Sequence, residues 1–179
     1  MMCVEIEAKL KVDSLPQIER KLRELGAEFL AEQSQTDYHL DDASATLTRN
    51  DRCLRLRRQV VGGSEEFFLT YKGAKEKSNF KKRREIEIEI KDADSTRKLL
   101  AALGYETVLV VEKNRRLWRL GECEVALDRL PLLGDFVEIE GPDDTEIADV
   151  QKSLGLAHVP HIPKSYAQLI KEQMNRRGV

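Results

Sequence analysis

The sequence has no long apolar run, few cysteines and almost no net charge. The chain has 179 residues, three cysteines and a formal net charge of −2. No segment is apolar and long enough to span a bilayer, and none resembles a signal peptide, so a cytoplasmic protein is expected. The near-balance of charge gives no reason to expect nucleic acid or an anionic membrane as a partner.

Cysteine and histidine motifs for metals or disulfides are also lacking. The three cysteines are odd in number and widely spaced, which predicts neither a disulfide framework nor a zinc site. His158 and His161 are close in sequence, but Pro160 breaks any helix that would bring both side chains to one face. The expected organisation is one domain spanning residues 1–179.

Charged residues, by contrast, make up 35% of the chain, and many of them alternate with apolar residues. Residues 4–10 read Val-Glu-Ile-Glu-Ala-Lys-Leu. Successive side chains of a strand point to opposite faces, so Glu5, Glu7 and Lys9 share one face and the apolar residues share the other. Related patterns recur at residues 54–57, 67–72, 83–90, 108–115, 125–128 and 136–140. These segments are predicted to be antiparallel strands with one polar face.

The polar faces of these strands hold mostly Glu, Arg and Lys. An ordinary solvated face explains any single strand, but such a face usually mixes Thr, Ser, Gln and Lys. A sheet closed into a barrel, with its apolar side outward under helices, would instead place the charges in its lumen. Charges that far from bulk water must be paired or must hold metals and ligands. The recurrence of the pattern favours the barrel with a charged lumen.

A unit that recurs along the chain predicts three helices. In each copy, a strand with Glu-Ile-Glu is followed by residues that can cap a helix, an amphipathic helix and a terminal Leu-Gly pair. The copies span residues 5–26, 87–104 and 138–155. The apolar stripes of the first two helices are Ile18, Leu22 and Leu25, and Leu99, Leu100 and Leu103. A fourth helix is expected from about residue 163 to residue 174, with loops at 41–50, 61–64 and 73–80.

The opening motif Glu5-x-Glu7-x-Lys9 resembles the signature of the CYTH superfamily, the triphosphate tunnel metalloenzymes. Further blocks are similar to those of the family and stand in the family order, at residues 54–58, 69–73, 83–87, 112–115, 127–128, 133–140 and 164–166. The resemblance covers essentially the whole chain and is nearest to the class IV adenylyl cyclase-like branch. It implies an α+β fold, a closed eight-stranded antiparallel β-barrel with a charged lumen and helices packed outside.

The resemblance also implies roles for individual residues. The carboxylates that it implies for Mg²⁺ or Mn²⁺ are Glu5, Glu7, Asp128, Glu138 and Glu140. The residues that it implies for the triphosphate are Lys9, Arg55, Arg57, Lys72, Arg83, Lys113 and Arg115. Glu85 and Glu87 match mid-chain acids that serve a second metal or orient neighbouring cations. The division is physically sound, because divalent cations prefer oxygen ligands whereas Arg and Lys bind phosphate.

Two reactions are compatible with a site that binds a divalent metal and a triphosphate. A cyclase converts ATP into cyclic AMP and pyrophosphate, and a phosphohydrolase uses water to cleave inorganic triphosphate or thiamine triphosphate. Lys9 and Lys113 are candidates for proton transfer if local charge lowers their pKa values. The alternatives from other classes are a non-catalytic polyphosphate- or nucleotide-binding module and a barrel with a purely structural ion-pair network. A homodimer is compatible with the sequence.

Overall fold

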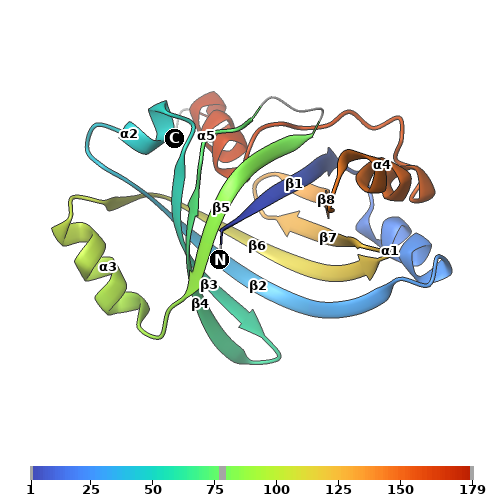
Figure 1. The fold of residues 1–179 in the computed structure, drawn as a ribbon, viewed down its shortest axis with the longest axis horizontal. Coiled ribbons are helices and arrows are strands. Elements are labelled where there is room, and N and C mark those ends of the chain that lie inside the picture. The colour runs from blue at the N-terminus through green and yellow to red at the C-terminus, as the bar shows by residue number, and fades with distance from the viewer. Residues whose placement is uncertain (1, 77–79, 178–179) are drawn as a thin grey trace.

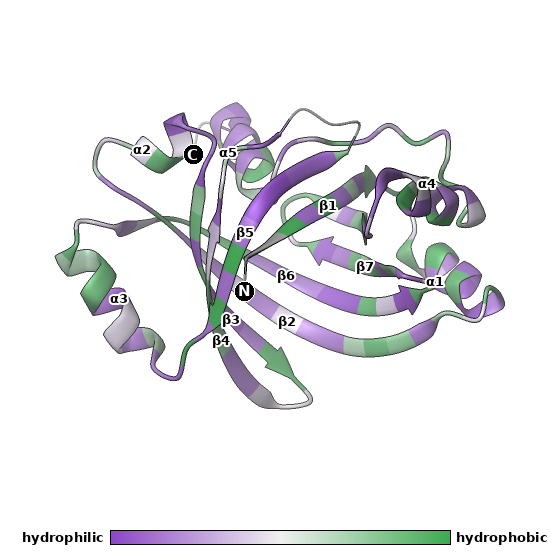
Figure 2. Ribbon diagram, viewed as in Figure 1, coloured by the Kyte–Doolittle hydropathy of each residue, from purple (hydrophilic) through white to green (hydrophobic). Residues whose placement is uncertain are grey.

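The alternating segments of the sequence are strands in the computed structural model, which describes residues 2–76 and 80–177. The bounds are β1 Met2–Lys11, β2 Glu28–Asp41, β3 Cys53–Val61, β4 Ser64–Lys72, β5 Lys81–Glu89, β6 Glu106–Leu120, β7 Cys123–Leu130 and β8 Gly134–Glu140. Figure 2 shows hydrophilic and hydrophobic residues alternating along several of them.

The strands close into an antiparallel barrel in the order β1-β5-β4-β3-β2-β6-β7-β8. The first strand closes it, because β1 pairs with β5 along one edge and with β8 along the other. Glu5 lies opposite Arg83 on β5, and Lys9 lies opposite Glu138 on β8. The predicted closed eight-stranded barrel is therefore confirmed.

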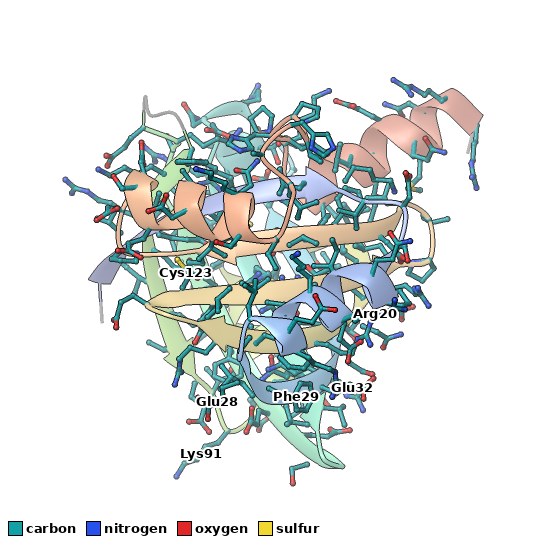
Figure 3. All side chains as sticks on the ribbon, turned by 90° about the vertical axis from the view of Figure 1, so that its right-hand side faces the viewer. Arg20, Glu28, Phe29, Glu32, Lys91 and Cys123 are labelled. Carbon is teal, nitrogen blue, oxygen red and sulfur yellow. The ribbon has the colours of Figure 1, made fainter. Side chains whose placement is uncertain are left out.

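Helices lie outside the barrel, as predicted (Figure 1). Their bounds are α1 Leu15–Glu24, α2 Thr46–Arg49, α3 Ala93–Ala102, α4 Asp144–Ser153 and α5 Tyr166–Arg177. Figure 3 shows α1 and α4 together over one side of the barrel, with Cys123 of β7 behind α4. None of the helices in the described ranges is long and apolar enough to cross a membrane.

The expected helix ends are mostly where the sequence placed them. The glycines at the ends of α1, α3 and α4 have φ values of 74°, 88° and 76°, the left-handed conformation that ends a helix without steric cost. Asp92 and Asp143 cap α3 and α4 by accepting hydrogen bonds from backbone N–H groups of the first turn. Ser14 makes no such bond at the start of α1, where Pro16 fills a position in the first turn.

Most of the apolar core lies between the barrel wall and α1 and α4. Leu10, Leu22, Val125, Ile139 and Ile147 are fully buried there. A second cluster packs α5 against the wall, and a third packs α3 against β2 and β3. Burying this apolar surface on the outside of the wall is what holds the helices to the barrel.

Three expectations about local structure were wrong. Strand β2 was not predicted, and the loop expected at 41–50 contains the one-turn helix α2. The stripe expected on α3 is largely exposed, because Leu100 is buried but Leu99 and Leu103 are 61% and 65% exposed. Leu25 also lies at the surface, at 39% exposure, just after α1. Residues 77–79 of the loop expected at 73–80 lie outside the described residues.

Candidate active site

The barrel encloses a cavity of about 590 Å³, lined by residues from all eight strands. Many of the lining residues occupy alternate positions of a strand, as Glu5, Glu7 and Lys9 do on β1. Thirteen of the fourteen predicted site residues line this cavity. They are Glu5, Glu7, Lys9, Arg55, Arg57, Lys72, Arg83, Glu85, Glu87, Lys113, Arg115, Glu138 and Glu140. Asp128 alone among the predicted residues does not line it.

The first group of charges joins β1 to β4 and β5. Lys72 Nζ lies 2.7 Å from Glu5 Oε1 and 2.8 Å from Glu85 Oε2, so one lysine bridges two carboxylates. Lys81 Nζ lies 2.6 Å from Glu7 Oε1. Both glutamates of the opening motif are therefore paired with cations inside the barrel.

Glu140 lies beside this group, and its ionised form is disfavoured there. Burial, together with the nearby charges of Glu5, Glu7 and Glu85, raises the pKa of Glu140 to about 7, although Lys72 opposes the shift. Three carboxylates thus lie near enough to Glu140 to oppose its ionisation. A further cation would find oxygen ligands here.

The second group lies across the cavity, around Asp128 and Glu138. Arg115 donates two hydrogen bonds to Asp128, of 2.7 and 2.6 Å, and it also donates to Glu138. Lys113 Nζ lies 3.3 Å from Asp128 Oδ2, and the Tyr166 hydroxyl donates to the same oxygen at 2.9 Å. With 0% exposure, Asp128 lies behind its partners rather than at the cavity surface.

The charges around Glu138 set the protonation of this group. Burial alone would raise the pKa of Glu138, but Lys9, Arg115 and Lys113 hold it well below its usual range. Lys9 Nζ lies 3.1 Å from Glu138 Oε1. Burial and the neighbouring Arg115 lower the pKa of Lys113 to about 8, despite the attraction of Asp128. The ammonium group of Lys113 therefore gives up its proton more readily than that of an ordinary lysine.

A third group joins β2 to β3 and β4. Arg57 donates to both oxygens of Asp37, from Nε at 2.6 Å and from a terminal nitrogen at 2.8 Å. Arg55 lies 3.6 Å from Asp37 and donates to Thr70 Oγ1 at 3.1 Å. Although burial opposes it, the two arginines hold the pKa of Asp37 far below its usual range. Asp37 is ionised and fixes both guanidinium groups.

Two buried arginines keep a donor without a partner. Arg83 donates to the backbone oxygen of Asp51 at 3.1 Å and lies 3.5 Å from its carboxylate. Its Nε is buried and has no hydrogen-bond acceptor in the described part of the chain, and the same holds for Nε of Arg55. Buried donors are rarely left unpaired, so both atoms are suited to a ligand that brings acceptors into the cavity.

Comparison with known proteins decides the family. The CYTH domain family model matches residues 4–166 of the chain. The chain belongs to the CYTH family. A relative named "Putative adenylate cyclase MJ0240", from Methanocaldococcus jannaschii, is 29% identical over an aligned length of 175, and the alignment covers 93% of this chain and 98% of the relative. Adenylate cyclase CyaB of Aeromonas hydrophila is 26% identical over 95% of this chain and 90% of its own length.

The fold of this CYTH barrel matches solved structures as well. The PH1819 protein from Pyrococcus horikoshii superposes with a TM-score of 0.82 and 32% sequence identity. The alignment covers 94% of this chain and 99% of that protein. The resemblance drawn from the sequence motifs is thereby confirmed at the level of family and fold.

The CYTH family implies a divalent metal, and the donor set of this cavity suits one in its chemistry. Carboxylate oxygens are the ligands that Mg²⁺ and Mn²⁺ prefer, and the raised pKa of Glu140 marks where they crowd together. Among residues 2–76 and 80–177, no three His, Cys, Asp or Glu side chains converge closely enough to hold an ion. The lysines Lys72 and Lys81 occupy the carboxylates instead, so a metal would have to compete with them.

Among the residues of the CYTH cavity that sequence reasoning missed are Gln35, Asp37 and Lys81. All of them line the cavity. Lys81 stands two residues before Arg83, so the period of two, extended backward, would have found it. Gln35 and Asp37 lie on the unpredicted strand β2, where the outward residues are also polar and no alternation is visible.

Proposed function

We propose that the chain is a metal-dependent enzyme that binds a triphosphate in the barrel cavity and converts ATP into cyclic AMP and pyrophosphate. The observation that carries the proposal is the pair of buried, unpartnered Nε donors on Arg55 and Arg83, two residues that line a cavity rich in further cations. Phosphate oxygens are acceptors that suit arginine in charge and geometry. The names of the two curated relatives favour the cyclase over other reactions of triphosphates.

The proposed grip on the triphosphate uses Lys9, Arg55, Arg57, Lys72, Arg83, Lys113 and Arg115. Several of these cations are held by carboxylates in the ligand-free protein, for example Arg57 by Asp37 and Arg115 by Asp128. Such pairing fixes the guanidinium groups before the substrate arrives, so little side-chain entropy is lost on binding.

The proposed metal ligands are Glu5, Glu7, Glu138, Glu140 and Asp128, with Glu85 and Glu87 in a supporting role. Glu5, Glu7 and Glu140 are the strongest of these candidates, because the charges of Glu5 and Glu7 help to raise the pKa of Glu140. When bound, Mg²⁺ or Mn²⁺ would neutralise phosphate charge and stabilise the charge that develops at phosphorus. Asp128 needs its neighbours to move aside before it can contribute, since Arg115, Lys113 and Tyr166 surround it.

In the cyclase reaction the ribose 3′-oxygen bonds to the α-phosphorus, the bond from that phosphorus to the β-phosphate breaks, and the hydroxyl proton must be accepted. Lys113 and Lys9 are the proposed residues for proton transfer. Lys113 is better placed to exchange a proton near neutral pH, because its pKa is about 8 and it lies inside the cavity. Lys9 sits over the Tyr166 ring, with Nζ 4.2 Å from the ring centre, and donates to the backbone oxygen of Lys164.

A product assay tests the proposal directly. The purified protein is offered ATP, inorganic triphosphate and thiamine triphosphate in parallel, with Mg²⁺ or Mn²⁺. Cyclic AMP and pyrophosphate from ATP are the expected products. Orthophosphate without cyclic AMP would make the chain a tunnel phosphohydrolase, and no product from any of the three would reduce it to a binding module.

Arg57→Ala is expected to weaken triphosphate binding. The change removes a planar donor group from the cavity wall, and charge-assisted hydrogen bonds of this kind carry enough free energy for a loss of about tenfold or more in affinity. The measurement is the inhibition constant of inorganic triphosphate against ATP turnover.

Arg58→Ala is the matched control for Arg57→Ala. Arg58 is the next residue of β3, points away from the cavity and pairs with Glu65 at the surface. Its removal should leave the inhibition constant unchanged. Equal effects of the two substitutions would mean that the cavity face of β3 does not contact the triphosphate.

A further inference from the structure

A cluster of glutamines lines one end of the cavity. These residues belong neither to the proposed triphosphate-binding residues nor to the proposed metal ligands. Gln33 and Gln35 come from β2, and Gln59 lies opposite Gln35 on β3. Gln35 Nε2 donates to Gln33 Oε1 and to Gln59 Oε1, each at 2.7 Å. Gln59 Nε2 donates in turn to Glu66 at 3.1 Å. The amide of Gln35 is therefore held in one orientation by its two neighbours.

The oxygen of Gln35 is the exceptional atom of the cluster. Gln35 is 3% exposed, and its Oε1 is buried without a hydrogen-bond donor in the part of the chain that the structure describes. A buried acceptor without a donor lowers stability, so such atoms are uncommon in folded proteins. Both amide hydrogens of Gln35 are already used, and the free oxygen is left to accept one hydrogen bond from a molecule in the cavity.

The position of the cluster relates it to the triphosphate grip. Gln59 stands two residues from Arg57 on β3, which is about 7 Å along a strand. Gln35 lies opposite Lys113, and Gln33 lies opposite Arg115, on the neighbouring strand β6. A group attached to a triphosphate held by these cations would therefore reach the glutamines.

Apolar residues complete this end of the cavity. Leu117 and Ala126 face each other on β6 and β7, and both line the cavity. Leu117 stands two residues beyond Arg115, on the same face of β6. An apolar wall beside a fixed row of amides suits a flat ring with polar edges, because the ring faces need apolar contact and the edges need hydrogen bonds.

We propose that this end of the cavity is the nucleobase subsite, and that the Gln35 oxygen accepts a hydrogen bond from the exocyclic amino group of adenine. The inference rests on the proposed function, since it requires the triphosphate to lie among Arg57, Lys113 and Arg115. A glutamine amide oxygen is a common acceptor for the adenine amino group, and the two amide hydrogens of Gln35 stay on Gln33 and Gln59. A base with an oxo group at the same position presents an acceptor to the Gln35 oxygen and is disfavoured.

The test compares ATP with two analogues that change only the 6-position of the purine. Inosine triphosphate has an oxo group there, and purine riboside triphosphate has only hydrogen. The wild-type protein should have a kcat/KM for ATP about tenfold above that for either analogue, the size expected for one hydrogen bond left unmade. Equal kcat/KM values for the three nucleotides would overturn the subsite. The comparison uses only the wild-type protein, so it does not depend on the folding of a variant.

Gln35→Leu tests the residue itself. The variant should use ATP and purine riboside triphosphate equally well, because neither can then donate to residue 35. The inhibition constant of inorganic triphosphate, which has no base, should not change. Retention of the wild-type preference for ATP in a folded Gln35→Leu protein would overturn the assignment of Gln35.

Ser34→Ala is the matched control. Ser34 is the preceding residue of β2, and its hydroxyl lies on the outer face, 2.9 Å from Asn114 Oδ1. The control should keep the preference of the wild-type protein for ATP. If inorganic triphosphate neither inhibits nor reacts, and ATP is not turned over, the proposed function itself fails. If triphosphate inhibits and ATP reacts without discrimination at the 6-position, the nucleobase subsite alone fails.

Discussion

Glu7→Gln is expected to lower metal-dependent turnover by about a thousandfold. Metal ions contribute several kcal/mol to the stabilisation of a phosphoryl transition state, and each 1.36 kcal/mol corresponds to about tenfold in rate. The amide keeps the shape of the side chain and removes the charge that would hold the ion. The measurement is the rate of product formation with saturating Mg²⁺ or Mn²⁺ for both proteins.

The same substitution should leave the fold intact. Lys81 remains close to the carboxylates of Glu5 and Glu138 after the change. Melting curves followed by circular dichroism should show one cooperative transition for both proteins, with a lower midpoint for Glu7→Gln, because Lys81 loses its nearest counterion. Glu124→Gln is the control, because Glu124 lines the same cavity but its side chain is 46% exposed. A Glu7→Gln protein with full activity would exclude Glu7 from the metal site.

Asp128→Asn is expected to lower the free energy of unfolding by about 3–5 kcal/mol, the cost of breaking a buried ion pair on one side. Asp128 is fully buried and accepts hydrogen bonds from Arg115 and from the hydroxyl of Tyr166. The neutral amide would remove the counterion that Arg115 and Lys113 share, and among the described residues Arg115 would keep only Glu138. For a chain of this length, the melting temperature should fall by roughly 10 °C.

Urea denaturation measures this effect against an exposed pair of the same kind. Glu65→Gln removes the partner of Arg58, and the two side chains are 47% and 40% exposed. Exposed ion pairs contribute less than about 1 kcal/mol, so this control should denature near the wild-type midpoint. Equal midpoints for Asp128→Asn and the wild-type protein would mean that Asp128 carries little of the stability of the barrel.

The parts of the fold that the sequence predicted are those where polarity differs sharply between the two faces of a strand. On β1, charged and apolar residues alternate without exception from Val4 to Leu10. On β2, Ser34 and Thr36 on the outer face are polar like Gln33 and Gln35 on the inner face, so the period of two disappears. Periodicity in hydropathy reports a difference between faces, and a strand with two polar faces gives no such signal.

The sequence predicted which types of residue form the site, but not which residues pair with one another. The sequence placed Asp128 among acids that reach a common space, whereas the structure places it behind Arg115, with no surface on the cavity. Whether a side chain reaches the cavity surface depends on which residues of the neighbouring strands lie opposite it. That pairing register cannot be read from the sequence of one strand. The pairing of Asp37 with Arg57 could not be foreseen for the same reason, since it joins two neighbouring strands, one of them unpredicted.

The closure of the barrel by its first strand has a consequence for how the protein is made. Strand β1 pairs with β8, so the two edges that meet are separated by more than a hundred residues of chain. Contacts between such distant segments form late and slowly, because the loop between them must first be ordered. During synthesis, the pairing of Lys9 with Glu138 must wait until almost the whole chain has left the ribosome. The charged pocket is therefore a product of the last folding step, and refolding experiments should regain ligand binding after the helices and hairpins have formed.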